Sequence, residues 1–467
     1  MIDDELAMKA VRAALTRGGD FADIFVERRI STSFRLEEEK IEDSVTGLES
    51  GAGIRVIRGE SVAYAFTDDL SEASLLATAE VASATARSKS GVTEAGLVTA
   101  YAGQATFDDY LAVSDPQGLA GAQKVELAVR ADKAARARGS EITQVIISLG
   151  DSVQEVLMAN SLGEVVRDRR SRVRVAVNAI AVRKGNIQTG TKAPGMLGGY
   201  ELFDRISPED IGAEAADQAI VMLDARHAPS GTMVVIIHRG TGGVLFHEAC
   251  GHSLEADAIY KRASVFEGQM GKQIASRIVT ACDDATLGKE WGSFRHDDEG
   301  VPGQKTFVIE NGVLTSYLTD RKRAWRDGLP MTGNGRRQSY RHMPIPRMTN
   351  TYIVQGDATD EEIVADTRLA LYAKRLGGGE VNPVTGDFIF SVTEGYMVRD
   401  GRIEEPVKGA TLVGNGPRVL RAIDAIAGKL EHDPGTCGKD GQGVPVTTGQ
   451  PTLRVTEMVV GGTAEEV

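Results

Sequence analysis

Two dipeptides that favour tight turns, Asn311-Gly312 and Asp400-Gly401, each separate two short runs of apolar and β-branched residues. Both residues of such a pair tolerate a positive φ, which the two-residue turns of antiparallel hairpins require. Phe388-Ile-Phe-Ser-Val is another run typical of a strand, and residues 21–68 have the same character. Hairpins interleaved with a few helices predict an α+β fold with largely antiparallel sheets and packed helices.

Capping residues and the helical spacing of apolar residues predict where the helices lie between these strands. The expected helices cover residues 3–17, 71–87, 114–139, 207–224, 360–376 and 417–429. Further strands are expected at 142–182, with breaks at Gly150 and at 160–163, at 232–237 and at 277–281. A boundary near 225–231 divides the chain into an N-terminal helix and strand domain, residues 1–225, and a β-rich, metal-bearing C-terminal domain, residues 226–467. Residues 88–113 form a candidate sub-boundary inside the first domain.

The overall charge is acidic, with 53 basic and 66 acidic residues and a net charge of −13. Such a balance disfavours a protein that wraps nucleic acid. The first residues, Met-Ile-Asp-Asp-Glu-Leu, lack the basic and apolar regions of a signal peptide, and no apolar run reaches the length of a transmembrane helix. Three cysteines are too few for a disulfide scaffold in a chain of this size. We therefore expect a cytoplasmic protein that binds neither nucleic acid nor membrane.

The strongest chemical signal lies in Gly243-Val-Leu-Phe-His247-Glu248-Ala-Cys250-Gly251-His252-Ser-Leu-Glu255-Ala-Asp257. Two of the seven histidines lie five residues apart here, and Glu248 directly follows the first of them. Imidazole nitrogens are common zinc ligands, and a neighbouring glutamate can act as general base on a water held by the metal. Apolar residues precede the pair and acidic residues follow it, which predicts a buried helix that opens into a polar cleft.

The spacing of the two histidines argues against a regular helix as their support. In the His-Glu-x-x-His motif of zinc hydrolases the ligands lie about 40° apart around an α-helix, whereas five residues turn through about 140°. On an undistorted helix His247 and His252 would therefore point apart. They converge only if the helix is bulged, kinked or ended near His252, and Gly251 is the residue type that permits such a distortion. A pair of helix histidines without a metal is the competing interpretation.

A catalytic zinc usually takes three protein ligands and a water, so two histidines need a partner. Glu255 and Asp257 follow closely in sequence, and Cys250 lies near the helical face of His247. Cys437 stands among turn-forming glycines, a setting that predicts a loop at the surface or lining a site. A redox or structural site closed by four protein ligands, with Cys250 as the fourth, is the alternative.

Several motifs in the same order resemble the TldD/PmbA family of metallopeptidases, specifically its metal-bearing TldD branch. The motifs are confined to the C-terminal half, whereas the N-terminal layout of helices and strands agrees with the family without a diagnostic motif. The matching stretches are residues 247–257 quoted above, Asp297-Asp-Glu-Gly-Val-Pro-Gly-Gln304, Pro346-Arg-Met-Thr-Asn-Thr-Tyr352, Phe390-Ser-Val-Thr-Glu-Gly-Tyr396 and Cys437-Gly-Lys-Asp-Gly-Gln-Gly-Val-Pro-Val446.

The resemblance implies a set of functional residues. His247, His252 and Cys437 would bind Zn²⁺, and Glu248 would be the catalytic residue. Family members act on small or unfolded peptides in an extended conformation, and TldD pairs with the metal-free TldE (PmbA) in a two-subunit particle. We therefore expect a zinc metallopeptidase that works with a TldE-like partner or as a homodimer. A non-catalytic regulatory or binding subunit with a structural metal site is the alternative, because the family has also been linked to modulation of DNA gyrase.

Other residues near these motifs have less certain roles in the sequence. Asp297, Asp298 and Glu299 form a charge run that is typical of a solvated loop. Cys282 follows an expected strand and is interpreted as a small apolar packing residue. Candidates for an oxyanion donor or substrate-binding group, each more often structural, are Tyr317, Arg336, Arg337, His342 and Arg347.

Overall fold

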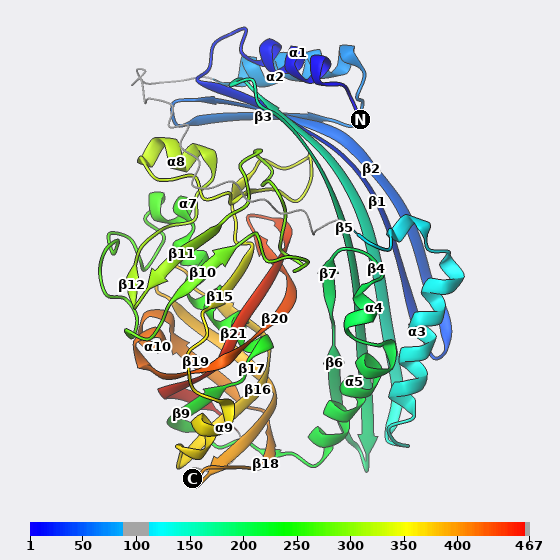
Figure 1. Ribbon diagram of the computed structural model, residues 1–467, viewed down its shortest axis with the longest axis vertical. Helices are drawn as coiled ribbons and strands as arrows, with labels where there is room; N and C mark the ends of the chain where they lie inside the picture. The colour runs from blue at the N-terminus through cyan, green and yellow to red at the C-terminus, as the bar shows by residue number, and fades with distance from the viewer. Residues whose placement is uncertain (87–111, 463–467) are drawn as a thin grey trace.

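The computed structural model describes residues 1–86 and 112–462 of the chain. The candidate sub-boundary at 88–113 therefore lies almost wholly outside the described residues. The two parts of the chain that the sequence separates near residue 225 build two different sheets (Figure 1). No helix in the described residues is long and apolar enough to cross a membrane.

The N-terminal half forms a seven-stranded antiparallel sheet in the order β3-β2-β1-β4-β5-β6, with β7 paired to β5. Its four central strands are 17 to 19 residues long, which corresponds to about 60 Å. They arch over the C-terminal half in Figure 1. The strands are β1 (Phe21–Glu37), β2 (Lys40–Arg58), β3 (Ser61–Thr67), β4 (Ile142–Asn160), β5 (Val165–Arg183), β6 (Asn186–Lys192) and β7 (Gly195–Leu197).

Helices cover one face of this sheet. The helices of this half are α1 (Asp4–Ala14), α2 (Glu72–Thr85), η1 (Pro116–Gly118), α3 (Gly121–Arg136), α4 (Leu202–Arg205) and α5 (Pro208–Leu223). Ser71 and Ser207, the first residues of the helices expected at 71–87 and 207–224, cap α2 and α5 through their side chains. The helix expected at 114–139 is wrong at its start, because Pro116 lies in a separate 3₁₀ turn. The break expected at Gly150 is also wrong, since β4 continues through it with both neighbouring strands paired.

The two faces of β5 have different chemistry. Val173, Val175 and the alternate residues after them pack beneath α3 and α5 in one apolar core. Side chains alternate between the faces of a strand. Arg170, Arg172 and Arg174 therefore project from the opposite face, where they contact the C-terminal half. The first sheet is thus covered by helices on one side and by the second half of the chain on the other.

The C-terminal half forms a twelve-stranded mixed sheet with a small separate ribbon. The main path is β12-β11-β10-β15-β21-β9-β16-β17-β18-β8, with β19 paired to β17 and β21, and β20 paired to β21. The strands are β8 (Arg226–His227), β9 (Gly231–Ile237), β10 (Ala281–Asp284), β11 (Lys305–Glu310), β12 (Val313–Leu314), β13 (Gly335–Arg336), β14 (Ile345–Pro346), β15 (Asn350–Ile353), β16 (Leu369–Val381), β17 (Asp387–Arg399), β18 (Arg402–Lys408), β19 (Thr411–Asn415), β20 (Ile423–Lys439) and β21 (Gln442–Gly461).

The helices of this half are short, and two predictions for them fail. The expected helix at 360–376 ends at Ala365, and β16 follows because it pairs with β9 and β17. The expected helix at 417–429 ends at Ala422, where β20 begins. The helical elements are η2 (Gly240–Gly243), α6 (Val244–Phe246), η3 (His247–Gly251), η4 (His252–Leu254), α7 (Ala256–Tyr260), α8 (Arg321–Asp327), α9 (Asp360–Ala365) and α10 (Gly416–Ala422).

Both turn dipeptides form the predicted hairpins. Asn311 and Gly312 have φ values of 49° and 80° and join β11 to β12. Asp400 and Gly401 have φ values of 45° and 77° and join β17 to β18. The mixed α+β fold with largely antiparallel sheets is therefore confirmed.

Candidate metal centre

His247 and His252 lie on a helical segment that is not a regular α-helix. The α-helical turn α6 runs into the π-helix η3, and the 3₁₀ turn η4 follows from His252. The amide N–H of His252 donates to the carbonyl oxygen of His247 and closes one wide π turn between the two residues. Because this bond spans five residues, it places side chains five apart on the same side of the segment. The ring centroids are 5.2 Å apart, so the predicted distortion is confirmed.

The distortion does not depend on the conformational freedom of Gly251. Its φ of −54° and ψ of −52° lie in the right-handed helical region that every residue adopts. Close packing favours the glycine instead, because a Cβ at this position would lie 2.2 Å from the sulfur of the buried Met348 side chain, which would have to shift. The sequence therefore predicts the distortion correctly and assigns the wrong role to Gly251.

Cys437 meets both imidazoles. Its Sγ lies 3.2 Å from Nε2 of His247 and 3.2 Å from Nε2 of His252. The thiol is carried by β20 and stands opposite Val444 of β21. The expected loop is therefore wrong at Cys437: the chain turns at Asp440 and Gly441, whose φ values are 49° and 74°.

The side chain of Glu248, on the π turn, lies beside the cluster formed by the two imidazoles and Cys437. Its carboxylate Oε2 lies 3.8 Å from Nε2 of His252. The Glu248 side chain is 27% exposed, whereas that of His252 is 12% exposed. The carboxylate therefore stands at the solvent side of the donor cluster.

The other nitrogen of each imidazole has its own partner. Nδ1 of His247 lies 3.0 Å from Oγ1 of Thr351, and Nδ1 of His252 lies 3.0 Å from Oε2 of Glu255. Such partners fix the ring orientation and leave Nε2 for a ligand. Glu255 is fully buried and is held by Lys439 at 2.9 Å. Glu255, considered from sequence as a third ligand, thus orients His252, and Asp257 binds Lys439 at 2.6 Å.

The electrostatics of the cluster favour a thiolate beside a protonated imidazole. Burial alone would raise the pKa of Cys437, but the two histidines outweigh it and lower that pKa to about 4. Burial alone would lower the pKa of His252, but Glu255 and Cys437 outweigh it and hold that pKa well above its usual range. The pKa of Glu255 falls to about 2 because Lys439 and His252 outweigh its burial.

Models of the PmbA/TldA metallopeptidase family match three parts of the chain: domain 1 at residues 22–86, the central domain at 114–223 and the C-terminal domain at 230–462. The metalloprotease TldD homolog of Haemophilus influenzae is 38% identical over 456 residues, which cover 96% of this chain and 94% of that protein. The chain belongs to the TldD/PmbA family. A metalloprotease of Methanothermobacter thermautotrophicus is 34% identical and covers 95% of this chain and 96% of its own length.

Solved structures of TldD/PmbA-like proteins share the fold of the whole chain. TldE from Thermococcus kodakarensis aligns with a TM-score of 0.78 at 18% identity, covering 98% of this chain and 100% of that chain. A Thermotoga maritima protein described as a candidate modulator of a DNA gyrase aligns with a TM-score of 0.80 at 23% identity, with the same coverage. At these identities the likeness concerns the fold alone. The names of the sequence relatives place this TldD/PmbA chain among the metallopeptidases.

Several other predicted residues are not members of the donor cluster. Cys250 is buried in the main apolar core, and burial raises the pKa of its thiol. Cys282 lies within β10, not after a strand, and is buried as expected. The hydroxyl of Tyr317 donates to the carbonyl of Phe266. Arg347 donates to the backbone carbonyl of Cys437, so its contribution to the site is structural support for β20.

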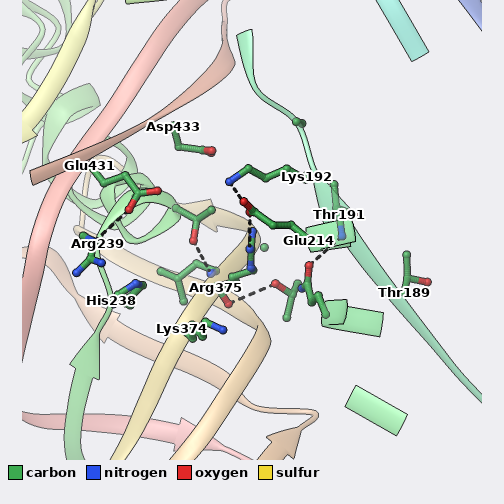
Figure 2. A pocket seen from close by; sticks show the side chains of 17 residues that line it. Thr189, Thr191, Lys192, Glu214, His238, Arg239, Lys374, Arg375, Glu431 and Asp433 are labelled. Atoms are coloured by element: carbon green, nitrogen blue, oxygen red, sulfur yellow. Dashed lines mark hydrogen bonds and ion pairs between the residues drawn. The ribbon is translucent and has the colours of Figure 1, made fainter. Parts of the chain in front are cut away.

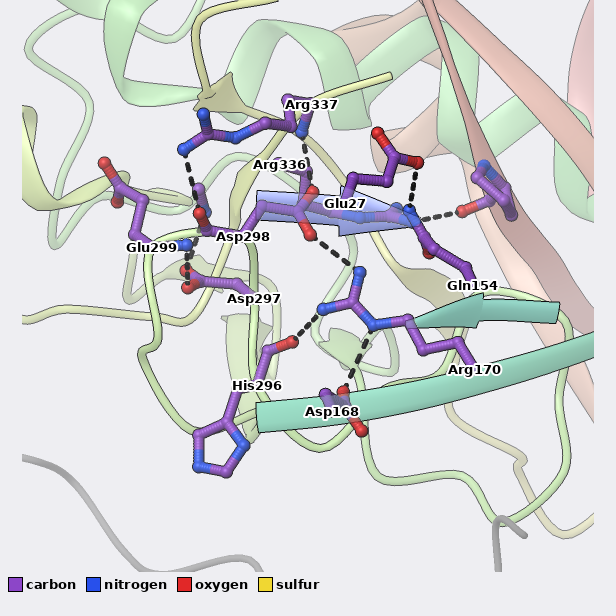
Figure 3. A network of polar contacts seen from close by, with 12 residues as sticks. Glu27, Gln154, Asp168, Arg170, His296, Asp297, Asp298, Glu299, Arg336 and Arg337 are labelled. Carbon is purple, nitrogen blue, oxygen red and sulfur yellow. Dashed lines mark hydrogen bonds and ion pairs between the residues drawn. The ribbon is translucent and has the colours of Figure 1, made fainter. Parts of the chain in front are cut away.

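The charge run Asp297–Glu299 is buried, so the solvated loop predicted from sequence is wrong. Arg170 donates to Asp298 Oδ1 at 2.7 Å, and the backbone N–H of Arg337 donates to the other oxygen at 2.8 Å (Figure 3). Asp297 accepts backbone N–H groups from its own loop and from Gly335. The run therefore connects the two halves of the protein.

A cavity of about 530 Å³ lies between the first sheet and the strands β16 and β20 (Figure 2). Lys192 and Arg375 both face Glu214 from opposite walls, at 2.7 and 3.7 Å. Asp433 enters from β20, and burial raises the pKa of its carboxyl to about 6. Asp433 and Cys437 project from the same face of β20, because they are four residues apart in a regular stretch of pairing. The cavity thus begins about 13 Å along the strand from the thiol.

Proposed function

We propose that this chain is a zinc metallopeptidase that hydrolyses peptide bonds of small or unfolded peptides. The observation that carries the proposal is the convergence of His247, His252 and Cys437, whose ligand atoms all lie within 4.8 Å of one another. Two imidazoles and a thiolate form a donor set that suits zinc, and catalytic zinc sites keep one position open beside three protein ligands.

The donor cluster fits an open site better than a closed one. Within residues 1–86 and 112–462, the group that can hold a metal has three members, and Cys250 is not among them. A structural zinc site would require a fourth protein ligand. Thr351 and Glu255 occupy the Nδ1 positions, so each Nε2 is directed toward the thiol. The alternative of a site closed by Cys250 therefore has no support from the geometry.

Zinc in this cluster would act as a Lewis acid on a water molecule and on the scissile carbonyl. Glu248 supplies the proton transfer, because its carboxylate stands beside the cluster and remains partly exposed. It accepts the proton of the attacking water and delivers it to the leaving amine. Glu255 keeps the ring of His252 in place, while Lys439 neutralises the buried carboxylate.

The cavity next to the cluster suits an extended peptide. Leu376 and Gly377 line it together with charged side chains such as Lys192, Glu214 and Arg375. A segment of about four extended residues would span the distance from Asp433 to Cys437 along β20.

We further propose a TldE-like partner subunit or a second copy as the element that closes the site, and a cytoplasmic location.

Removal of the metal tests the proposed function. We expect dialysis against 1,10-phenanthroline to abolish cleavage of an unstructured peptide, and one equivalent of zinc to restore it. Cleavage is followed by mass spectrometry, zinc by elemental analysis and the intact fold by circular dichroism, with a TldE-like partner added if the chain alone is inactive. Undiminished cleavage by folded, zinc-free protein contradicts the proposal, and zinc binding without any cleavage favours the structural-site alternative.

The apparent zinc affinity should rise with pH. His252 must lose its proton to bind a metal, and its pKa is held well above the usual range. Cys437, whose pKa is about 4, is already a thiolate near neutrality and releases no proton there. One proton released per zinc corresponds to an affinity that increases about tenfold per pH unit. The increase should persist above pH ~6.5, where an ordinary histidine would no longer contribute.

Competition with a chelator of known affinity, measured from pH ~6 to ~8, determines this slope. In Glu255→Gln the anion that raises the pKa of His252 is absent, so the affinity should stop rising at a lower pH. A pH-independent affinity of the wild type over this range would rule out proton release by His252.

A further inference from the structure

A second cavity, of about 200 Å³, lies between the inner face of the first sheet and loops of the C-terminal half. Five arginines line it, although the chain as a whole is acidic. They are Arg29, Arg170, Arg172, Arg336 and Arg337. We refer to this space as the arginine cavity.

Strand register places three of these arginines on one surface. Arg29 of β1 stands opposite Gln154 of β4, which in turn stands opposite Arg170 of β5. In the next row, Ser152 of β4 stands opposite Arg172. Side chains opposite each other in antiparallel strands lie about 5 Å apart at Cβ. The sheet therefore presents its cations to the cavity as a fixed array.

Two of the arginines in this array are balanced by acids. Arg29 donates to Glu27 at 2.7 Å. Arg170 donates to Asp168 at 3.1 Å and to Asp298 at 2.7 Å (Figure 3). The backbone N–H of Arg337, in the loop opposite, donates to the carboxylate of Asp298, and the guanidinium of Arg337 donates to the backbone carbonyl of Asp298.

Arg172 and Arg336 are different, because among the described residues the structure pairs neither of them with a carboxylate. Arg172 donates to the backbone carbonyls of Trp291 and Ser293, and Arg336 donates to those of Met348 and Pro445. The two side chains are only 6% and 4% exposed. Carbonyl groups satisfy hydrogen bonds but do not neutralise charge, so both guanidiniums are buried cations.

The surroundings of Arg172 and Arg336 destabilise the charged form of both guanidiniums. Burial, and then repulsion from the neighbouring arginines, lowers the pKa of Arg172 to about 9. Burial lowers the pKa of Arg336 to about 10 despite the attraction of Asp298. Nε of Arg337 is also buried without a hydrogen-bond partner in the part of the chain that the structure describes. Asp298 also lines the cavity, but the five arginines outnumber this carboxylate, so the lining as a whole is cationic and suited to an anion.

We propose that the arginine cavity binds a compact oxyanion, with Arg172 and Arg336 as its principal ligands. The planar fork of guanidinium matches the oxygen pairs of carboxylate and phosphate. The volume admits a phosphate ion or the carboxylate end of a peptide, but not a folded partner. Solute can enter beside Gln338, which is exposed at the rim.

The arginine cavity shares a structural element with the metal centre. Gly443 and Pro445 of β21 line the cavity. They flank Val444, which pairs with Cys437. Because side chains alternate, these two residues face the side of the hairpin opposite to the thiol. An anion in the cavity therefore binds against the back of the hairpin that supplies Cys437.

Inorganic phosphate is the first probe, added to the full chain at constant ionic strength with chloride as the replaced ion. We expect a saturable rise in melting temperature, because a ligand that binds only the folded state stabilises it. Arg172→Gln should weaken the apparent phosphate affinity by about tenfold or more, the value of a hydrogen bond to a charged group. The matched control is Arg174→Gln, on the same face of the same strand, which donates to Pro434 and does not line the cavity.

A second variant keeps every arginine. Ser152→Asp places a carboxylate opposite Arg172, so it should raise the melting temperature without phosphate and remove the response to phosphate. This variant remains informative if Arg172→Gln fails to fold. A Ser152→Asp protein that responds to phosphate as the wild type does contradicts the proposal.

Short acetylated peptides with a free or an amidated C-terminus distinguish the two sources of the oxyanion. Stabilisation by phosphate alone identifies a free anion site, whereas stabilisation by the carboxylate peptide, absent with its amide, identifies a site for a peptide end. Both responses should depend on Arg172. If neither probe stabilises the wild type, or if Arg172→Gln responds as the wild type does, the proposal is overturned. None of these measurements requires zinc or peptidase activity.

Discussion

We expect the exchange of Glu248 for glutamine to lower the rate of peptide hydrolysis by about 10²- to 10⁴-fold, the usual contribution of a general acid–base residue. Glutamine keeps the size of the side chain but cannot accept the proton of the attacking water. The zinc content should not change, because Glu248 is outside the cluster of His247, His252 and Cys437. The measurement is kcat for an unstructured peptide together with zinc stoichiometry.

The control for Glu248 is a glutamate of matched exposure in the same half of the chain. Glu405 of β18 is 26% exposed, compared with 27% for Glu248, and it pairs with Arg399. Glu405→Gln should retain full activity. Wild-type cleavage by Glu248→Gln would exclude this residue as the general base.

Replacing His247 by alanine should remove both zinc and activity. The imidazole is 2% exposed and provides one of the three converging donors. Loss of a residue that hydrogen-bonds to a metal ligand typically lowers metal affinity by about 10- to 100-fold, and loss of the ligand itself should lower it further. Zinc titration and peptide cleavage are measured on the same preparation, after the melting temperature has shown that the variant is folded.

Thr351→Val provides a graded comparison for His247→Ala. It removes the hydroxyl that contacts Nδ1 of His247 and keeps a side chain of similar shape. Zinc affinity should fall by about 10- to 100-fold, because the ring remains but loses its orienting partner. A His247→Ala protein that binds zinc as tightly as Thr351→Val would exclude His247 as a ligand.

Features that depend on a few neighbouring residues are predicted well from the sequence. The Asn311-Gly312 and Asp400-Gly401 turns form because their residues adopt positive φ without help from the rest of the fold. The distortion between His247 and His252 is predictable because five residues cannot align two ligands on an α-helix. The motifs also identify the family, which the sequence relatives confirm.

Features that depend on distant partners are not predicted. Residues 369–376 have an apolar pattern compatible with a helix. They form a strand because they pair with β9 on one side and with β17 on the other. The glycines around Cys437 suggest a loop, yet pairing with β21 extends β20 through the cysteine. Asp298 and Glu299 are buried because Arg170 and Arg55 from the other half of the chain compensate them, whereas Asp297 accepts backbone N–H groups.

A basic run in the sequence indicates the arginine cavity, although the net charge of the whole chain is negative. Residues 167–174 read Arg-Asp-Arg-Arg-Ser-Arg-Val-Arg, a basic run within an acidic chain. Alternation along a strand sends Arg170, Arg172 and Arg174 to one face. The pattern shows that one face of the strand is cationic, but only the structure shows that it is buried and that Arg336 approaches it from the opposite wall.

The proposed metal centre consists of residues that are synthesised at very different times. His247 and Cys437 are 190 residues apart in the chain. During synthesis both histidines are therefore made long before Cys437. Strand β20 can join the sheet only after the intervening strands have been made. Contacts of such separation form late, because the loop between them must first be closed. The donor set is complete only when nearly the whole molecule has folded, so an unfinished chain cannot assemble the centre.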